Sequence, residues 1–128
     1  MKSNFRIIST TEIEFNDVEL DLHNNFDFIL EDLTVQEKQI ILRFKKSRGD
    51  WAREVKYQTL NFVLDNCSFF KHVDAEPEFI TDDQCLAGIT FMDSDFREED
   101  NALIDREEPN PSDDLIFSFE SGRLIRVN

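Results

Sequence analysis

Hydrophobic and polar residues alternate with a period of two along most of this chain, which is the pattern of half-buried β-strands. Residues 26–30 carry Phe, Phe and Leu at every second position, and residues 40–44 carry Ile, Leu and Phe in the same arrangement. Because the polar connection at 32–38 is short, the pattern predicts that the two strands are antiparallel neighbours in a hairpin.

Residues 57–64 fit a strand whose alternation slips by one residue at Thr59, as at a β-bulge. The same stretch also fits a helix, because Tyr57, Leu60 and Leu64 follow one another at spacings of three and four. A further alternating run at 69–73, after a tight turn, favours the strand. For residues 55–67 the sequence leaves both alternatives open.

The run at 85–91 alternates with apolar residues on both of its faces, which predicts a central strand covered on each side or on one strongly buried face. An acidic, proline-bearing segment at 93–114 then interrupts the alternation, apart from a short apolar island at 102–104. We expect one long excursion there, or two loops that flank a short edge strand.

The last residues of the chain predict a closing hairpin. Residues 115–119 and 124–127 alternate on either side of a Ser-Gly pair, which fits a two-residue turn in which Gly122 takes a positive φ. Shorter runs at 5–9 and 12–15 predict another hairpin near the start.

These elements predict a mostly β fold, an antiparallel β-sandwich or open barrel of about eight or nine short strands with at most one short helix. The 128 residues fit one domain, residues 1–128. Thirteen Phe stand against one Trp and one Tyr, so we expect a core built on phenylalanine rings that have no polar group to satisfy.

Charge is distributed very unevenly along this chain. Between Asp74 and Glu120 sixteen acidic residues stand against two basic ones, Arg97 and Arg106, so this segment carries the whole net charge of −14. On the loops of a rigid β-scaffold such residues set up a field that attracts a basic protein. The predicted partner-binding residues are Asp93, Asp95, Glu98, Glu99, Asp100, Asp105, Glu107, Glu108, Asp113 and Asp114.

Two consequences follow if these carboxylates form one coherent surface patch. Steering by the patch speeds association with a basic partner and weakens as salt is added. Reversing the charges of Glu107, Glu108, Asp113 and Asp114 slows association more than it speeds release. The alternative is a solvated, self-repelling loop that only keeps the protein in solution.

The sequence predicts no catalytic, cofactor-binding or metal site. Close carboxylate pairs occur wherever 28 acidic residues share 128 positions, so they indicate no acid–base chemistry. The acidic run that begins at Asp93 lacks the glycine and the final glutamate of a calcium loop. The soft zinc ligands are His23, Cys67, His72 and Cys85, and their spacing forms no paired motif.

Other partners are disfavoured by charge and hydropathy. The basic cluster at 43–56 is offset by a total charge that repels a phosphate backbone, so we expect no direct nucleic-acid binding. The apolar runs are too short to span a membrane. Residues 1–10 contain no apolar stretch of a secretory signal, so we expect a cytoplasmic protein with two reduced cysteines.

From about Asp21 onward the chain shows early paired strands, a strand at 60–64 followed by Phe69 and Phe70, a long acidic excursion, and a closing hairpin through Phe117, Phe119, Gly122 and Arg126. This order of elements resembles that of small β-rich immunity proteins of bacterial toxin systems, and the resemblance covers most of the chain. It implies a protein that binds and neutralises a partner toxin, often a basic nuclease. No residue role is carried over from it.

The sequence therefore favours a non-enzymatic, acidic binding protein, an immunity or inhibitor protein that neutralises a basic partner such as a cognate toxin. A nucleic-acid mimic, in which carboxylates stand in for phosphates, is an alternative that would bind several unrelated DNA-binding proteins. A small enzyme using two carboxylates, and an uncharacterised domain in solution, are the others. The sequence indicates no oligomeric state.

Overall fold

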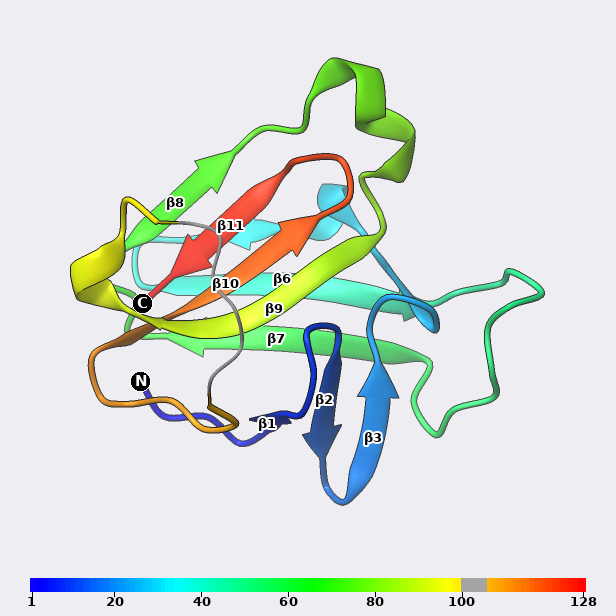
Figure 1. Cartoon of the computed structure of the whole chain (residues 1–128), viewed down its shortest axis with the longest axis horizontal. Helices are drawn as coiled ribbons and strands as arrows, with labels where there is room; N and C mark the ends of the chain where they lie inside the picture. The colour runs from blue at the N-terminus through cyan, green and yellow to red at the C-terminus, as the bar shows by residue number, and fades with distance from the viewer. Residues whose placement is uncertain (100–105) are drawn as a thin grey trace.

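Two antiparallel sheets lie face to face and a third lies beside them (Figure 1). The computed structural model describes residues 1–99 and 106–128, and within these residues the chain forms eleven strands. Aromatic rings from the first two sheets meet between them, so the arrangement is an antiparallel β-sandwich. The predicted fold class is confirmed.

The first sheet is organised around β6 (Gln39–Lys46), which pairs with β4 (Phe26–Phe28), β5 (Thr34–Val35) and β7 (Thr59–Asp65). The predicted antiparallel pairing of the strands at 26–30 and 40–44 is confirmed, although Leu30 lies beyond the end of β4.

Strand β7 settles the choice between strand and helix for residues 55–67 in favour of the strand. Its pairing with β6 runs from Thr59 to Asp65 without a shift in register, so the predicted bulge at Thr59 is wrong. The apparent slip arises because Tyr57 precedes the strand, whereas Leu60, Phe62 and Leu64 alternate regularly within it.

The second sheet has the order β8 (Phe70–Val73), β11 (Leu124–Val127), β10 (Asp113–Phe119) and β9 (Leu86–Asp93). The prediction that residues 85–91 form a central strand is wrong, because β9 is at the edge of the sheet. Its backbone is covered there by the chain before β2 (Glu12–Phe15), where the Thr10 carbonyl accepts a hydrogen bond from the Ile89 N–H at 2.8 Å.

The closing hairpin is confirmed, but its turn is one residue longer than predicted. Phe119 N–H donates to the Arg123 carbonyl at 3.0 Å, and Gly122 N–H donates to the Phe119 carbonyl at 3.0 Å. Three residues, Glu120 to Gly122, therefore form the loop, and Gly122 adopts φ +87° as expected for the glycine of such a turn.

The third sheet consists of β1 (Arg6–Ile7), β2 (Glu12–Phe15) and β3 (Val18–Asp21). The predicted pairing of the first two strands is confirmed, and β3 is an addition to it. The turn between β2 and β3 places Asn16 and Asp17 at positive φ, a conformation that Asn and Asp tolerate better than most residues.

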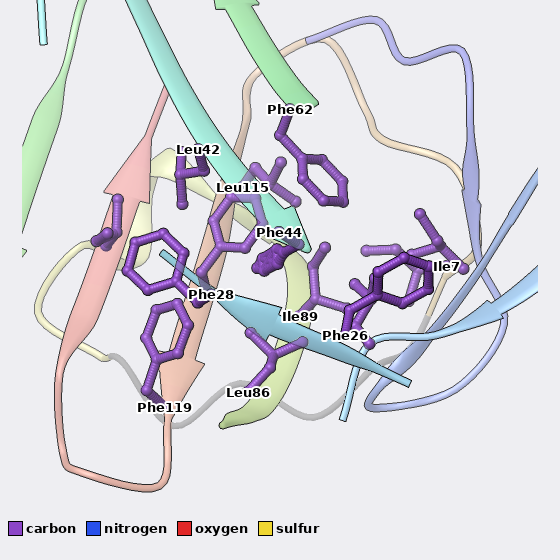
Figure 2. Close-up of a cluster of buried hydrophobic side chains, with 14 of the residues drawn as sticks. Ile7, Phe26, Phe28, Leu42, Phe44, Phe62, Leu86, Ile89, Leu115 and Phe119 are labelled. Atoms are coloured by element: carbon purple, nitrogen blue, oxygen red, sulfur yellow. The ribbon is translucent and has the colours of Figure 1, made fainter. Parts of the chain in front are cut away.

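Phenylalanine rings fill the space between the first two sheets (Figure 2). Phe28 lies 4.6 Å from Phe119 between ring centroids, and Phe62 lies 5.1 Å from Phe117. Phe44 joins both pairs, at 5.4 Å from Phe28 and 6.4 Å from Phe117. The expectation of a phenylalanine core is confirmed.

The helical segments in the described residues are three short 3-10 turns: η1 (Leu30–Asp32), η2 (Pro77–Asp82) and η3 (Ser94–Phe96). Of the described residues, none belongs to a helix with the length and hydropathy needed to cross a membrane. Segment η2 protrudes from one end of the second sheet, and η3 lies at the other end (Figure 1).

Candidate functional site

Two of the ten predicted partner-binding residues are buried inside the protein. Asp113 and Asp114 open strand β10 and are each 0% exposed. The prediction that they contact a partner at the surface is therefore wrong. Both carboxylates are instead used within the molecule by its own arginines.

Asp114 is the centre of a buried ion-pair network. Its Oδ2 accepts hydrogen bonds from Arg126 Nε at 2.7 Å and Arg97 Nε at 3.0 Å, and its Oδ1 accepts one from Asn128 Nδ2 at 2.9 Å. Burial raises the pKa of Asp114, but these hydrogen bonds outweigh burial and hold that pKa below its ordinary value. The carboxylate is therefore held ionised.

Arg126 connects this network to the acidic segment. Its side chain is 0% exposed, and its guanidinium also donates to the backbone carbonyls of Asp93, Phe96 and Glu99 at 3.1–3.2 Å. The first residues of the acidic segment are thus fixed to the second sheet by a buried cation. Asp113 is paired in a similar way with Arg106, with Nε to Oδ2 at 2.7 Å.

Of the other predicted residues that the structure describes, one group lies at the end of β9 and just after it, and Glu107 lies beside β1 of the third sheet. Asp95, Glu98, Glu99 and Glu108 are exposed, and Asp93 is half-buried. Glu107 is exposed and paired with Arg6 at 2.8 Å. Asp100 and Asp105 lie outside the described residues.

A second acidic group lies at the opposite end of the sheet and is absent from the predicted set. The four residues Asp74, Glu76, Glu78 and Asp82 are exposed on the excursion that joins β8 to β9. Strand β9 separates them from Asp93, and its eight residues span roughly 26 Å at ~3.3 Å per residue. The acidic residues therefore form two groups and not one coherent patch.

Two large apolar side chains are exposed among the second group. Phe79 and Ile80 of η2 are 46% and 52% exposed. We refer to Asp74, Glu76, Glu78, Phe79, Ile80 and Asp82 together as the η2 surface. Exposed apolar residues with a polar rim are typical of an interaction surface.

Arg123 fixes both ends of the chain segment that carries the η2 surface. Its buried guanidinium donates from Nε to Asp83 Oδ1 at 2.8 Å, and its Nη1 lies 3.7 Å from Asp74 Oδ1. Ser121 Oγ donates to the same Asp83 oxygen at 2.7 Å. The segment thus protrudes from a base that is held by ionic and hydrogen-bonded contacts.

These contacts shift the pKa of two groups at the base. Burial raises the pKa of Asp83, but hydrogen bonds from Arg123 and Ser121 outweigh it and lower that pKa. Burial and the neighbouring Arg123 charge both lower the pKa of His72, whose Nε2 lies 2.6 Å from Arg123 Nη1. A neutral His72 accepts that hydrogen bond, which a protonated ring cannot do.

Of the four soft ligands considered in the sequence, the structure brings two together. Cys85 Sγ lies 3.3 Å from His23 Nδ1, although the residues are 62 positions apart. Cys67 contacts the Leu64 carbonyl, and His72 lies beside Arg123. No spacing in the sequence indicates the contact of His23 with Cys85, because tertiary packing alone creates it. Both cysteines are free thiols.

A groove of about 1020 Å³ lies between the N-terminal residues and strand β7. Phe5, Phe15, Tyr57 and Leu60 contribute to its lining, and its charged side chains are Lys2 and Asp65. This lining suits an apolar or extended chain and brings no set of acid, base and nucleophile together.

Comparison with known proteins identifies no relative: the chain matches no family model, no curated protein and no solved structure.

Proposed function

We propose that this chain is a non-enzymatic binding protein, that its partner is a basic protein, and that the η2 surface makes the contact. The observation that carries this proposal is the exposure of Phe79 and Ile80 among four exposed carboxylates on a segment fixed at its base by Arg123. The proposal keeps the acidic character predicted from the sequence and moves the contact to other residues.

The composition of the η2 surface supports a protein partner. Large apolar side chains provide burial in the centre of an interface, at about 25 cal/mol per Å² of apolar area removed from water. Carboxylates around them steer a cationic partner and set its orientation. Because Arg123, Ser121 and Asp83 hold the base, less conformational entropy is lost on binding than for a mobile loop.

The paired carboxylates Asp83 and Asp114 are poorly suited to act as general acids. A general acid near neutral pH needs a raised pKa, whereas hydrogen bonds lower the pKa of Asp83 and Asp114 against the effect of burial. These groups serve as fixed charges that hold the chain in place.

The immunity or inhibitor function that the sequence resemblance implies is a specific form of this proposal, with a basic toxin as the partner. The nucleic-acid mimic is less well supported, because a mimic requires carboxylates in a continuous array. The exposed acidic groups here are separated by the length of β9.

The test begins with capture of partners from an extract of the cells in which the chain is made, followed by calorimetry on the purified pair. We expect a protein with a basic isoelectric point, whose affinity falls between low and physiological salt. The variant Phe79→Ser should weaken binding on the order of tenfold or more, as expected for an apolar residue in an interface centre.

Matched variants at the other end of the sheet are the controls. Phe96 is 51% exposed, close to the exposure of Phe79, so Phe96→Ser removes a similar ring from η3. Glu78→Lys and Glu98→Lys change the total charge equally, and we expect only Glu78→Lys to slow association several-fold.

Three outcomes would overturn the proposal. In the first, Phe79→Ser and Phe96→Ser weaken the complex equally. In the second, the captured partner is acidic. In the third, the chain forms a dimer that Phe79→Ser dissociates, which would assign the η2 surface to a second copy of the chain.

A further inference from the structure

Three potential metal ligands from separate parts of the chain meet at the end of the second sheet near η2. His23 follows β3, Cys85 precedes β9, and Glu120 begins the turn between β10 and β11. One ligand atom from each lies within 4.8 Å of the other two. All three side chains are partly open to solvent, so an ion can reach them.

We propose that His23, Cys85 and Glu120 form a binding site for a divalent, thiol-binding cation such as Zn²⁺. The donor set of one nitrogen, one sulfur and one carboxylate oxygen is of the kind that zinc takes, with water in the fourth position. This inference is independent of the proposed contact at the η2 surface.

The distances fit such an ion. Zinc bonds of about 2.0–2.3 Å in a tetrahedron place neighbouring ligand atoms roughly 3.3–3.8 Å apart. Cys85 Sγ and His23 Nδ1 are 3.3 Å apart, and Nδ1 and Glu120 Oε1 are 4.0 Å apart. Glu120 is half-exposed, so a small rotation of its side chain brings the carboxylate into bonding distance.

Backbone contacts hold the three residues in this arrangement. The Glu120 N–H donates to the Cys85 carbonyl at 2.9 Å, which joins two of the ligands directly. Asp21 Oδ1 accepts a hydrogen bond from the His23 N–H at 3.0 Å and fixes the start of that loop. The backbone around the site is therefore in place before an ion arrives, and binding requires the His23 ring to exchange its hydrogen bond to the Leu86 carbonyl for the ion.

The charges around Cys85 favour a cation over thiol catalysis. Burial and the carboxylates of Glu120, Asp27, Asp82 and Asp21 all raise the pKa of the Cys85 thiol. A raised pKa makes a poor nucleophile at neutral pH, since the thiolate is the reactive form. The same carboxylates attract a divalent cation, which displaces the thiol proton when it binds.

Binding changes the protons at two atoms in a defined way. In the free protein Nδ1–H of His23 donates to the Leu86 carbonyl at 2.7 Å. When Nδ1 bonds the ion, its proton is lost and Nε2 takes up a proton, so the ring keeps one. The thiol of Cys85 loses its proton to solvent, so about one proton is released for each ion at neutral pH.

The experiment is a titration of the full-length, reduced protein with Co²⁺, which reports thiolate bonding by an ultraviolet charge-transfer band. We expect a band that saturates at one ion per chain and disappears when Zn²⁺ is added. Calorimetry of Zn²⁺ binding in buffers of different ionisation enthalpy should show release of about one proton. The band should persist when Ca²⁺ is present in excess, because calcium prefers oxygen ligands.

The second cysteine gives a matched control. Cys85→Ser should abolish the band, and Cys67→Ser should leave it unchanged. Glu120→Gln and His23→Gln should each lower the affinity at least about tenfold while the far-ultraviolet circular dichroism stays that of the folded protein.

Three results would overturn the site. They are the absence of a thiolate band at a one-to-one ratio of Co²⁺ to protein, a band that Cys85→Ser retains, and a band that Cys67→Ser removes. The partner test at η2 uses none of these variants, so either inference can fail without the other.

Discussion

At the scale of single residues, Asp114 is expected to contribute strongly to stability. Replacing it with Asn removes the charge and leaves the guanidinium of Arg126, which is 0% exposed, without its carboxylate. Removal of one partner of a buried ion pair costs about 3–5 kcal/mol. We therefore expect Asp114→Asn to lower the free energy of unfolding by that amount, measured by urea denaturation.

The control for Asp114 is an acidic residue from the same segment. Glu108 is exposed, so Glu108→Gln should change the free energy of unfolding by less than ~0.5 kcal/mol. Equal effects of the two variants would contradict the structural role given to Asp114.

His72 makes stability depend on pH in mildly acidic solution. Its pKa in the folded chain is below the unfolded value of about 6.5, because burial and Arg123 oppose protonation. The unfolded chain binds more protons in that window, so the free energy of unfolding is highest above about pH 6.5 and falls as pH drops below it.

The variant His72→Gln should lose less of its free energy of unfolding as the pH falls, because Gln does not titrate. The side-chain oxygen of Gln can also accept the hydrogen bond from Arg123. The measurement is urea denaturation of both proteins at several values between about pH 5 and 7. The same slope against pH in both would show that His72 does not carry the effect.

The burial of Asp113 and Asp114 could not be predicted from charge along the sequence. Charge counts treat each carboxylate as exposed, yet Arg97 and Arg126 lie 17 and 12 positions from Asp114 and meet it only in the folded sheet. The residue types are compatible with exposed carboxylates and with carboxylates in buried ion pairs. Tertiary contacts decide between the two.

At the scale of elements, alternation predicted the long strands and missed features that depend on neighbours. β6 and β10 follow the predicted patterns, whereas the short strands β3 and β5 carry too few residues to show a period. β9 is an edge strand although its sequence predicted a central one, and its Ile89 N–H is bonded by the Thr10 carbonyl from the chain before β2. The sequence of β9 alone does not indicate that contact.

The turn between β10 and β11 depends on its glycine. Gly122 adopts φ +87°, and an added Cβ would lie 3.2 Å from Glu76 Cγ. Left-handed backbone costs roughly 1–2 kcal/mol for a residue with a Cβ. Gly122→Ala should therefore lower the free energy of unfolding by about that amount, and Gly122→Asn by less, because Asn tolerates this conformation.

Thermal unfolding of the wild type and the two Gly122 variants checks the expected order of stability. An unfolding temperature that stays unchanged in Gly122→Ala would contradict the turn geometry.

Strand β7 is an edge strand with a free side. In the described part of the chain its strand partner is β6, and Val63 on its outer face is 51% exposed. A long edge with exposed apolar residues promotes pairing between molecules, and a lysine there blocks it. We expect Val63→Lys to slow aggregation in light scattering and to change the free energy of unfolding by less than ~0.5 kcal/mol.

For Val63, the matched substitution is Asn61→Lys on the same face of β7, where no exposed apolar side chain is removed. It separates the effect of added charge from the effect of lost hydrophobic surface. Faster aggregation of Val63→Lys than of the wild type would contradict the role of this edge.

At the scale of the whole molecule, the sequence predicted the sign of the charge but not its distribution. The acidic segment is continuous in the chain, yet β9 carries its two parts to opposite ends of one sheet. Only part of the predicted binding residues therefore lie together at a surface. The contact of His23 with Cys85 is likewise absent from the sequence pattern, since it joins residues 62 positions apart that meet only in the folded chain.

The net charge of −14 should make the folded chain more stable in moderate salt than in its absence. Like charges held in a compact volume repel one another and favour the unfolded chain. The Debye length falls from about 30 Å at 0.01 M to about 8 Å at 0.15 M salt, which is shorter than the roughly 26 Å between the two acidic groups. Salt therefore screens the repulsion between the groups.

Exposed ion pairs act in the opposite direction. The pairs of Arg6 with Glu14 and Glu107 weaken in salt, but each such pair is worth about 0–1 kcal/mol. The pair of Arg126 with Asp114 is shielded from salt because both side chains are 0% exposed. Repulsion among the many unpaired carboxylates should therefore prevail.

We expect urea denaturation to give a higher free energy of unfolding at 0.15 M than at 0.01 M NaCl, the two conditions between which screening changes most. Urea is the required denaturant, because guanidinium chloride is itself a salt. In Glu98→Gln/Glu99→Gln the repulsion is smaller, so the gain from salt should be smaller too. A free energy that falls with salt would show that the exposed ion pairs, and not the excess of carboxylates, set the electrostatic balance of this fold.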